Sequence, residues 1–95
     1  MHRITKRQLE SSVNVLNETL GLPLEPYQST RDDKGGLVAN GGTFVLDYAY
    51  GGVALCRMCK GGGQSTVSVI GTIREAHTYV SAILVGIRAA RESRQ

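Results

Sequence analysis

Groups of adjacent glycines divide the middle of this sequence into short segments, and this pattern restricts the fold more than any other feature. The groups are Gly41-Gly42, Gly51-Gly52 and Gly61-Gly62-Gly63. They separate four β-prone runs, at Leu37–Asn40, Thr43–Tyr50, Val53–Lys60 and Ser65–Ile70. Glycine adopts the positive φ that tight hairpin turns require. The pattern therefore predicts an antiparallel meander of about four strands over residues 37–70.

The residues before this region carry the signals of an amphipathic helix. Thr5 and Gln8 have the spacing of a capping box, and apolar residues then recur at helical spacing as far as Gly21. This predicts a helix over residues 5–20 that ends at the glycine. Two prolines and a charge run then predict a connecting loop over residues 21–36.

A second helix is predicted after the glycine-rich region. Thr72 and Glu75 form another capping box, and an apolar stripe follows, so we expect a helix over residues 72–91. The order helix, sheet, helix indicates an α+β fold with both helices on one face of an antiparallel sheet. A chain of 95 residues has room for one such domain, spanning 1–95.

The predicted strand Thr43–Tyr50 alternates between two kinds of side chain. The more apolar set is Phe44, Leu46, Tyr48 and Tyr50, and the other set is Thr43, Val45, Asp47 and Ala49. We expect the first set to be buried and the second to be semi-polar. Two helices cover only one sheet face, so the other face and the edges would remain uncovered. This predicts a homo-oligomer, a dimer or larger.

Two cysteines, Cys56 and Cys59, have a spacing that is also found in zinc and redox sites. There is no second pair, and the chain contains only His2 and His77 as histidines, which argues against a four-ligand metal site. An offset of three places the two sulfurs on opposite faces of a strand and disfavours a disulfide. We interpret both as packing residues, and expect neither metal nor cofactor.

Charge and hydropathy limit the partners. The net charge of +3 is modest, and much of it lies in Arg88, Arg91 and Arg94, where cations stabilise a helix C-terminus. No RNP, KH-type or finger motif is present, so we expect no specific nucleic-acid binding. No run of about eighteen apolar residues and no secretory signal occurs, which predicts a cytoplasmic protein without membrane contact.

No set of residues indicates catalysis, so we expect no enzyme. Glu75 is assigned to capping, and Asp47 is the only acidic residue within a predicted strand. Asp47 has two open interpretations, as a half-exposed sheet residue or as an acceptor for a ligand hydroxyl. His77 lies beside the apolar stripe of the second helix and is interpreted as a packed or surface residue.

Arg74 indicates a possible anion site. A cation at the second position of a helix opposes the positive end of the dipole, and the N–H groups after Thr72 could bind a phosphate beside it. The alternative is an exposed Arg74 that pairs with Glu75 or reaches solvent. Arg57 within a strand must face solvent or a ligand. With the aromatic residues, the candidate ligand-binding residues are Phe44, Asp47, Tyr50, Arg57, Thr72 and Arg74.

The order of these motifs resembles a family of phage proteins. The similar segments are L-E-S-S-V-N-V-L-N-E, L-D-Y-A-Y-G-G-V-A-L, a glycine-rich turn, and G-T-I-R-E-A-H-T-Y-V-S-A-I-L-V-G-I, within residues 9–88. They resemble the anti-Thoeris proteins of the first-described type, which sequester nucleotide immune signals. The resemblance implies capture of glycocyclic ADP-ribose, and of cyclic oligonucleotides at a separate site, without degradation. It also implies dimers that assemble into rings, such as a hexamer, in the cytoplasm of the infected bacterial host.

Two other classes remain open. A phage or prophage structural or partner-binding protein would use the same aromatic residues and oligomer without any small ligand. A weak nucleic-acid binder would show an affinity that falls steeply with salt.

Overall fold

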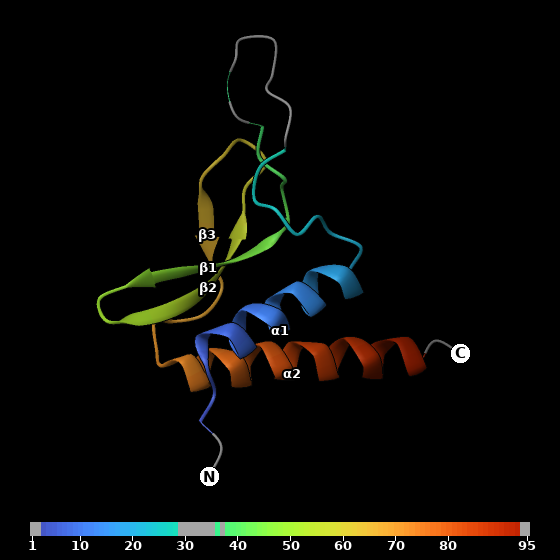
Figure 1. Cartoon of the computed structure of the whole chain (residues 1–95). Coiled ribbons are helices and arrows are strands. Elements are labelled where there is room, and N and C mark those ends of the chain that lie inside the picture. Colours follow the sequence, from blue (N-terminus) through green and yellow to red (C-terminus); the bar gives the residue numbers. More distant parts are fainter. Residues whose placement is uncertain (1–2, 29–35, 37, 94–95) are drawn as a thin grey trace.

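The chain folds into a small sheet with two helices packed against one of its faces (Figure 1). The structure is a computed structural model that describes residues 3–28, 36 and 38–93. The elements are α1 (Lys6–Thr19), β1 (Phe44–Ala49), β2 (Gly52–Met58), β3 (Gln64–Thr66) and α2 (Ile73–Glu92). The strands are antiparallel in the order β1-β2-β3. The predicted α+β fold is confirmed, with three strands in the sheet instead of about four.

The predicted strand over residues 37–40 is wrong in its described part. Ala39 forms an isolated bridge with Tyr27, and Leu37 lies outside the described residues. The N–H of Gln28 donates to the carbonyl of Val38, and the N–H of Asn40 donates to the carbonyl of Pro26, at 2.8 and 2.9 Å. Residues 38–40 therefore pair with residues 26–28, and they do not join the sheet.

The last predicted strand, residues 65–70, also differs from the structure, because β3 ends at Thr66. The N–H groups of Val67 and Ser68 both donate to the carbonyl of Leu55, which bends the chain out of the regular ladder. Gly71 then forms a bridge with Val53 on the same side of β2. Residues 67–71 thus form a linker that is hydrogen-bonded to β2 near both of its ends.

Both helix starts agree with their sequence signals. Thr5 and Gln8 form a complete capping box, with distances of 2.8 and 3.1 Å, and Thr72 and Glu75 form another with two bonds of 3.1 Å. Gly21 follows α1 with a φ of 71°, a conformation that costs glycine little. Neither described helix is long and apolar enough to cross a membrane.

The hydrophobic core lies between the two helices and the face of the sheet that they cover (Figure 1). Its buried members are Leu9, Val13 and Leu16 of α1, Phe44, Val53 and Leu55 of the sheet, and Ala76 and Val80 of α2. The two helices also meet at their C-terminal ends, where a terminal guanidinium nitrogen of Arg91 donates to the carbonyl of Thr19 at 2.7 Å. This bond satisfies a carbonyl that the end of α1 would otherwise expose.

Asn17 fixes α1 to the free edge of the sheet. It is 1% exposed; its Nδ2 donates to the carbonyl of Phe44 at 3.0 Å, and its Oδ1 accepts from the Phe44 N–H at 2.8 Å. β1 is an edge strand, and unpaired edge groups invite pairing with other chains. The amide of Asn17 occupies the edge groups of Phe44, and α1 shields this end of β1.

The apolar set of β1 is buried at only one end, so the prediction of a buried face is wrong for half of its members. Phe44 is 7% exposed and Leu46 is half-buried, but Tyr48 is 43% and Tyr50 97% exposed. Thr43, assigned to the semi-polar set, is fully buried and donates to the carbonyl of Pro23. The reason is that the core covers the start of β1, whereas the hairpin end extends past it (Figure 1).

The central strand β2 is buried on both faces. Val53 and Leu55 belong to the core, and Ala54 and Cys56 are also buried on the opposite face, although no helix covers them. The helices thus leave this second face uncovered, but its central side chains are still buried because they are small and are screened by their cross-strand neighbours. Cys56 is a packing residue as predicted, and burial raises the pKa of its thiol. The same prediction is wrong for Cys59, which is exposed because it lies beyond the end of β2 at Met58; both thiols are free.

Candidate functional site

An open concavity of about 420 Å³ lies where the β1–β2 hairpin meets the start of α2. We call it the hairpin-end site. Its lining residues are Tyr48, Ala49, Tyr50, Gly51, Gly52, Val53 and Ile73. Its volume is within the range of pockets that bind small molecules, about 300–1,000 Å³. In the described part of the chain, the β1–β2 hairpin and the start of α2 both border this space, which is large enough for a small ligand.

Backbone contacts fix the hairpin end against the start of α2. Val53 and Gly71 exchange two hydrogen bonds of 2.9 and 3.0 Å. A Cβ at position 52 would lie 2.7 Å from the carbonyl oxygen of Gly71, so only glycine fits there. The positive φ of the turn is adopted by Tyr50 and Gly51, at 53° and 74°. The two adjacent glycines therefore serve different purposes, one for the turn and one for a close approach.

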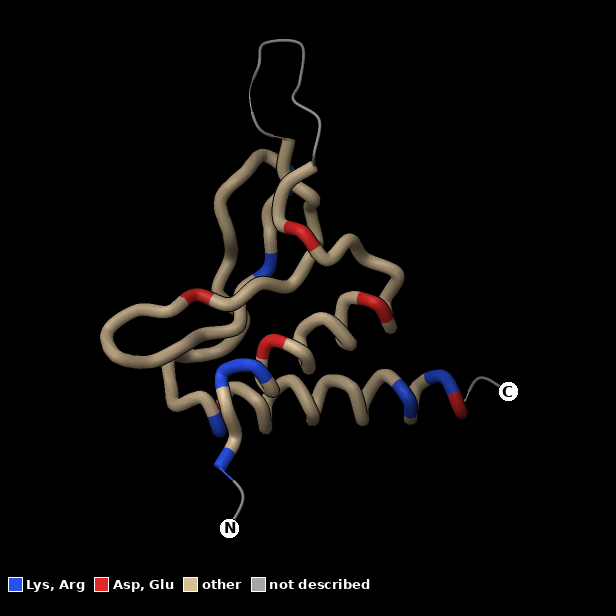
Figure 2. Tube along the Cα trace, viewed as in Figure 1, with Lys and Arg blue, Asp and Glu red and all other residues tan. Residues whose placement is uncertain are grey.

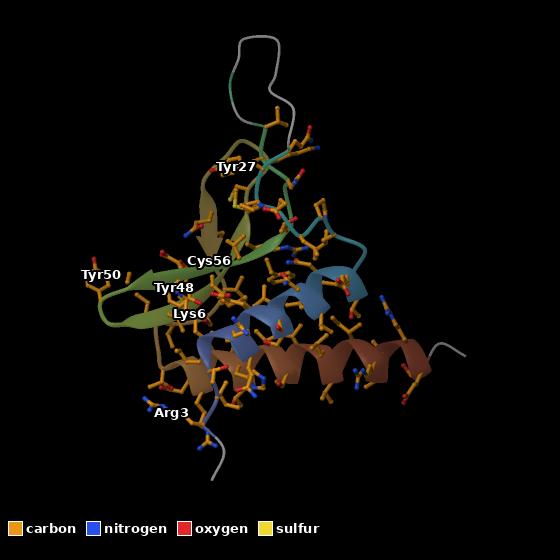
Figure 3. All side chains as sticks on the ribbon, in the orientation of Figure 1. Arg3, Lys6, Tyr27, Tyr48, Tyr50 and Cys56 are labelled. Carbon is orange, nitrogen blue, oxygen red and sulfur yellow. The ribbon has the colours of Figure 1, made fainter. Side chains whose placement is uncertain are left out.

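Two tyrosines give the site an aromatic character (Figure 3). The Nζ of Lys6 lies 4.6 Å from the centroid of the Tyr48 ring, close enough for a cation–π interaction. The Tyr48 hydroxyl donates to a carboxylate oxygen of Glu10 at 3.3 Å. Burial, and next the negative charge of Glu10, raise the pKa of the Tyr48 phenol. Tyr50 makes no comparable packing contact among the described residues and leaves its ring to the solvent.

Positively charged residues are concentrated at the end of the molecule where the two helices begin. Figure 2 shows lysine and arginine positions where the two helices begin. They are Arg3, Lys6 and Arg7 around the start of α1, and Arg74 in the first turn of α2, all of them exposed. The N-terminal ends of helices carry partial positive charge as well. Cations and helix dipoles therefore act in the same direction on a ligand at this end.

The start of α2 is a weaker anion site than the sequence predicted. The Thr72 hydroxyl accepts from the N–H of Glu75, and the Glu75 carboxylate accepts from the N–H of Thr72. The bond from the Thr72 N–H, and next an interaction with the Thr72 side chain, hold the pKa of the Glu75 carboxyl below its usual range. The N-terminal end of α2, which would attract an anion, therefore already carries an ionised carboxylate. The first turn of α1 contains no acidic residue. A phosphate is therefore better accommodated on the α1 side, near Lys6.

Phe44 and Arg57 lie elsewhere. The guanidinium carbon of Arg57 is 4.9 Å from the centroid of the Phe44 ring, and its Nε donates to the carbonyl of Gly42 at 2.8 Å. This pair is at the start of β1, and at about 3.3 Å per residue the strand places it roughly 20 Å from Tyr50. Arg57 is exposed, as a charge within a strand requires. The two residues cannot share one small ligand with the hairpin-end site.

Asp47 is also separate from the hairpin-end site. It pairs with Ala54 on the sheet face opposite the helices, and it is half-buried. Its charge helps to raise the pKa of the Cys56 thiol, after burial, which is the larger cause. Of the six predicted ligand-binding residues, the structure thus brings Tyr50, Thr72 and Arg74 to one end, and places Phe44 with Arg57 at another. Asp47 lies apart from both.

Six of the seven lining residues of the hairpin-end site were not among the predicted ligand-binding residues: Tyr48, Ala49, Gly51, Gly52, Val53 and Ile73. The alternation along β1 places Tyr48 and Tyr50 on one side, so the first could have been found. Gly52 and Ile73 depend on the contact between the hairpin and α2, for which local sequence has no signal. No group of three or more potential metal ligands occurs among the described residues.

Comparisons with known proteins found no match for the chain. No family model matches it, and neither a curated protein nor a solved structure shows a match. The resemblance of the sequence to anti-Thoeris proteins therefore remains a prediction.

Proposed function

We propose that this chain is a phage anti-defence protein that binds a cyclic nucleotide immune signal at the hairpin-end site and holds it without degrading it. The observation that carries the proposal is a concavity of about 420 Å³ lined by two tyrosines, with the Lys6 Nζ 4.6 Å from the centroid of the Tyr48 ring and Arg74 next to the lining residue Ile73. A nucleotide needs these two features, because its base stacks on aromatic rings and its phosphates require positive charge.

The individual contacts follow from the geometry. Tyr50 is 97% exposed and offers a ring face to a base, while Tyr48 is held by Lys6 and Glu10 and forms the wall of the site. We expect Lys6, which contacts the Tyr48 ring, and Arg74, which follows the lining residue Ile73, to supply charge for phosphates. Because the lining consists of aromatic, aliphatic and glycine residues, it provides shape and contact for a ligand that is released unchanged.

The test is a calorimetric titration with cyclic nucleotides, including glycocyclic ADP-ribose. A hydrogen bond to a charged group is worth about 1.5–3 kcal/mol, so Lys6→Ala and Arg74→Ala should each weaken binding by roughly ten- to a hundred-fold. Arg88→Ala is the matched control, because this exposed cation of α2 lies more than three turns from the site. Thermal stability without ligand should change by less than about 1 kcal/mol in the two site variants. Each removes a cation from a helix start, but each also removes a contact of the folded state, which for Lys6 is the contact with the Tyr48 ring.

The second part of the test concerns the fate of the ligand. After incubation and heat release, the nucleotide should be recovered chemically intact. A hydrolysed product that forms only with the protein would show an enzyme. Normal binding by both Lys6→Ala and Arg74→Ala would show that the hairpin-end site is not the phosphate site, and Arg57 would become the better candidate.

A partner-binding role without a small ligand is the second candidate. It is favoured by the exposed aliphatic residues of the linker, above all Val69, which is 88% exposed. A titration without detectable binding of any nucleotide would favour this role over the first.

A further inference from the structure

Tyr50 occupies a position in the β1–β2 turn that folding alone does not favour. Ala49 pairs with Gly52, so Tyr50 and Gly51 form a two-residue turn, and their φ values of 53° and 74° are both positive. Turns of this type favour asparagine followed by glycine, because a bulky side chain is strained at positive φ. Among the described residues, Tyr50 is the only one other than glycine with a positive φ. A smaller residue would therefore suit this turn better.

Packing within the chain does not offset the strain at Tyr50. Its side chain is 97% exposed, and Figure 3 shows it at the end of the hairpin. Backbone strain of this kind is concentrated at functional sites, where another interaction requires the residue. The Tyr50 ring also lines the hairpin-end site. Strain and exposure together therefore indicate that this ring contacts a group from outside the chain in that site.

The lining of the hairpin-end site has few groups that could identify a base. Among the described residues that line it, only the two tyrosines have side chains with hydrogen-bonding atoms. The Tyr48 hydroxyl already donates to Glu10, and the backbone N–H and carbonyl of Val53 are bonded to Gly71. Proteins distinguish bases by hydrogen bonds to the base edges. Stacking does not depend on such bonds, because every base has a π face.

The site thus offers a ring for stacking and little that distinguishes one base from another. We infer that the hairpin-end site holds a nucleotide by stacking its base on Tyr50, and that it accepts different bases with similar affinity. This inference rests on the proposed function, and it adds that the ligand is recognised by its phosphates and its shape. The ligands of this site are then a class of cyclic nucleotides that differ in their bases.

The experiment is a calorimetric titration of the full chain with two pairs of ligands. One pair is glycocyclic ADP-ribose and its hypoxanthine analogue, and the other is cyclic di-AMP and cyclic di-GMP. All four ligands contain purines, but within each pair the amino donor of adenine is replaced by a carbonyl acceptor. The affinities within a pair should agree within about threefold, whereas a site that reads the base edge discriminates by roughly five- to a hundred-fold.

Two substitutions test the ring of Tyr50. Tyr50→Asn removes it and should weaken every ligand that binds by roughly five- to a hundred-fold, with an unchanged ratio within each pair. Because asparagine is favoured at this turn position, the melting temperature without ligand should rise by several degrees. Tyr50→Phe keeps the ring and should retain the wild-type affinity. Tyr27→Asn is the matched control, because Tyr27 is also exposed, at 37%, and does not line the site.

The outcomes distinguish this inference from the proposed function. Similar affinities within a pair, together with a stabilised Tyr50→Asn that binds weakly, support it. A preference of more than about tenfold for one member of a pair overturns it, while the proposed function stands. Full affinity or a lower melting temperature in Tyr50→Asn also overturns it, because the ring would then be unnecessary for binding or would stabilise the fold. If no nucleotide binds to the wild type, the inference and the proposed function are both wrong.

Discussion

The two ends of β1 belong to one strand but differ in burial, because the core covers one end and the other end is exposed. At Phe44 the backbone polar groups are held by the buried amide of Asn17 and the ring lies in the core. Six residues later, Tyr50 is exposed on a turn that is held by backbone bonds between Val53 and Gly71 and by the contacts of Tyr48 with α1. The Phe44 end is built for stability, whereas the hairpin end leaves the Tyr50 ring in the solvent. We expect mutations at the two ends to separate folding from binding.

The largest effect is expected for Asn17→Leu, at the Phe44 end. Leucine has a similar size but leaves the N–H and carbonyl of Phe44 buried without a partner. Each unsatisfied buried group costs about 1–3 kcal/mol, so the free energy of unfolding should fall by about 2–6 kcal/mol. Urea denaturation followed by circular dichroism measures this change. Asn14→Leu on the exposed side of α1 is the control and should change stability by less than about 0.5 kcal/mol.

A smaller effect is expected for Gly52→Ala, at the hairpin end. The added methyl group would lie 2.7 Å from the carbonyl oxygen of Gly71 and 2.9 Å from a side-chain carbon of Ile70, so the hairpin must move away from α2. Overpacking of this kind costs about 1–3 kcal/mol. Because the movement opens the hairpin-end site, nucleotide affinity should fall as well.

Gly61→Ala provides the control for this substitution, since a Cβ at position 61 meets nothing within 4 Å. Its stability and affinity should remain near those of the wild type. If Gly52→Ala retained full affinity while losing stability, the contact with α2 would be structural only, and the hairpin-end site would not depend on it.

Much of the fold could be predicted because its signals are local. The two capping boxes, the glycine after α1 and the glycine turns each depend on residues a few positions apart, and all are present in the structure. The predicted strand at residues 37–40 is wrong because β propensity does not specify which segment a β-prone run pairs with. Ala39 pairs with Tyr27 and not with the sheet. Similarly, nothing near Asn17 in the sequence shows that it meets Phe44, 27 residues away.

The candidate site was less predictable than the fold. Arg74 was proposed because a cation at a helix start opposes the helix dipole, and Tyr50 was proposed as one of the aromatic residues on which a base could stack. Their grouping with Phe44 and Asp47 was wrong, because alternation along β1 specifies the face of a residue and leaves open which part of that face the helices cover. The contact of Gly52 with Gly71 involves two glycines, and any of the chain's glycines could have had this role.

The smallest effect, and the most specific one, concerns the proton on Tyr48. Burial and the carboxylate of Glu10 raise the pKa of this phenol, so the folded state favours its protonated form. This contribution to stability is fully present below the ordinary tyrosine pKa of about 10, and is lost as pH rises through the higher value in the folded state. Ultraviolet titration should therefore show one of the four tyrosines ionising later than the others.

Two substitutions assign that late component. Tyr48→Phe should remove it, while Glu10→Gln should shift it only part of the way back, because burial remains as the larger cause after the charge is gone. Both substitutions leave Tyr50 unaffected, so nucleotide affinity should change far less than in Lys6→Ala. A titration in which Glu10→Gln moves no tyrosine would show that the bond between α1 and the hairpin does not persist in solution. The hairpin end would then be held by its contact with α2 alone, and the contrast between the two ends of β1 would be greater than the structure indicates.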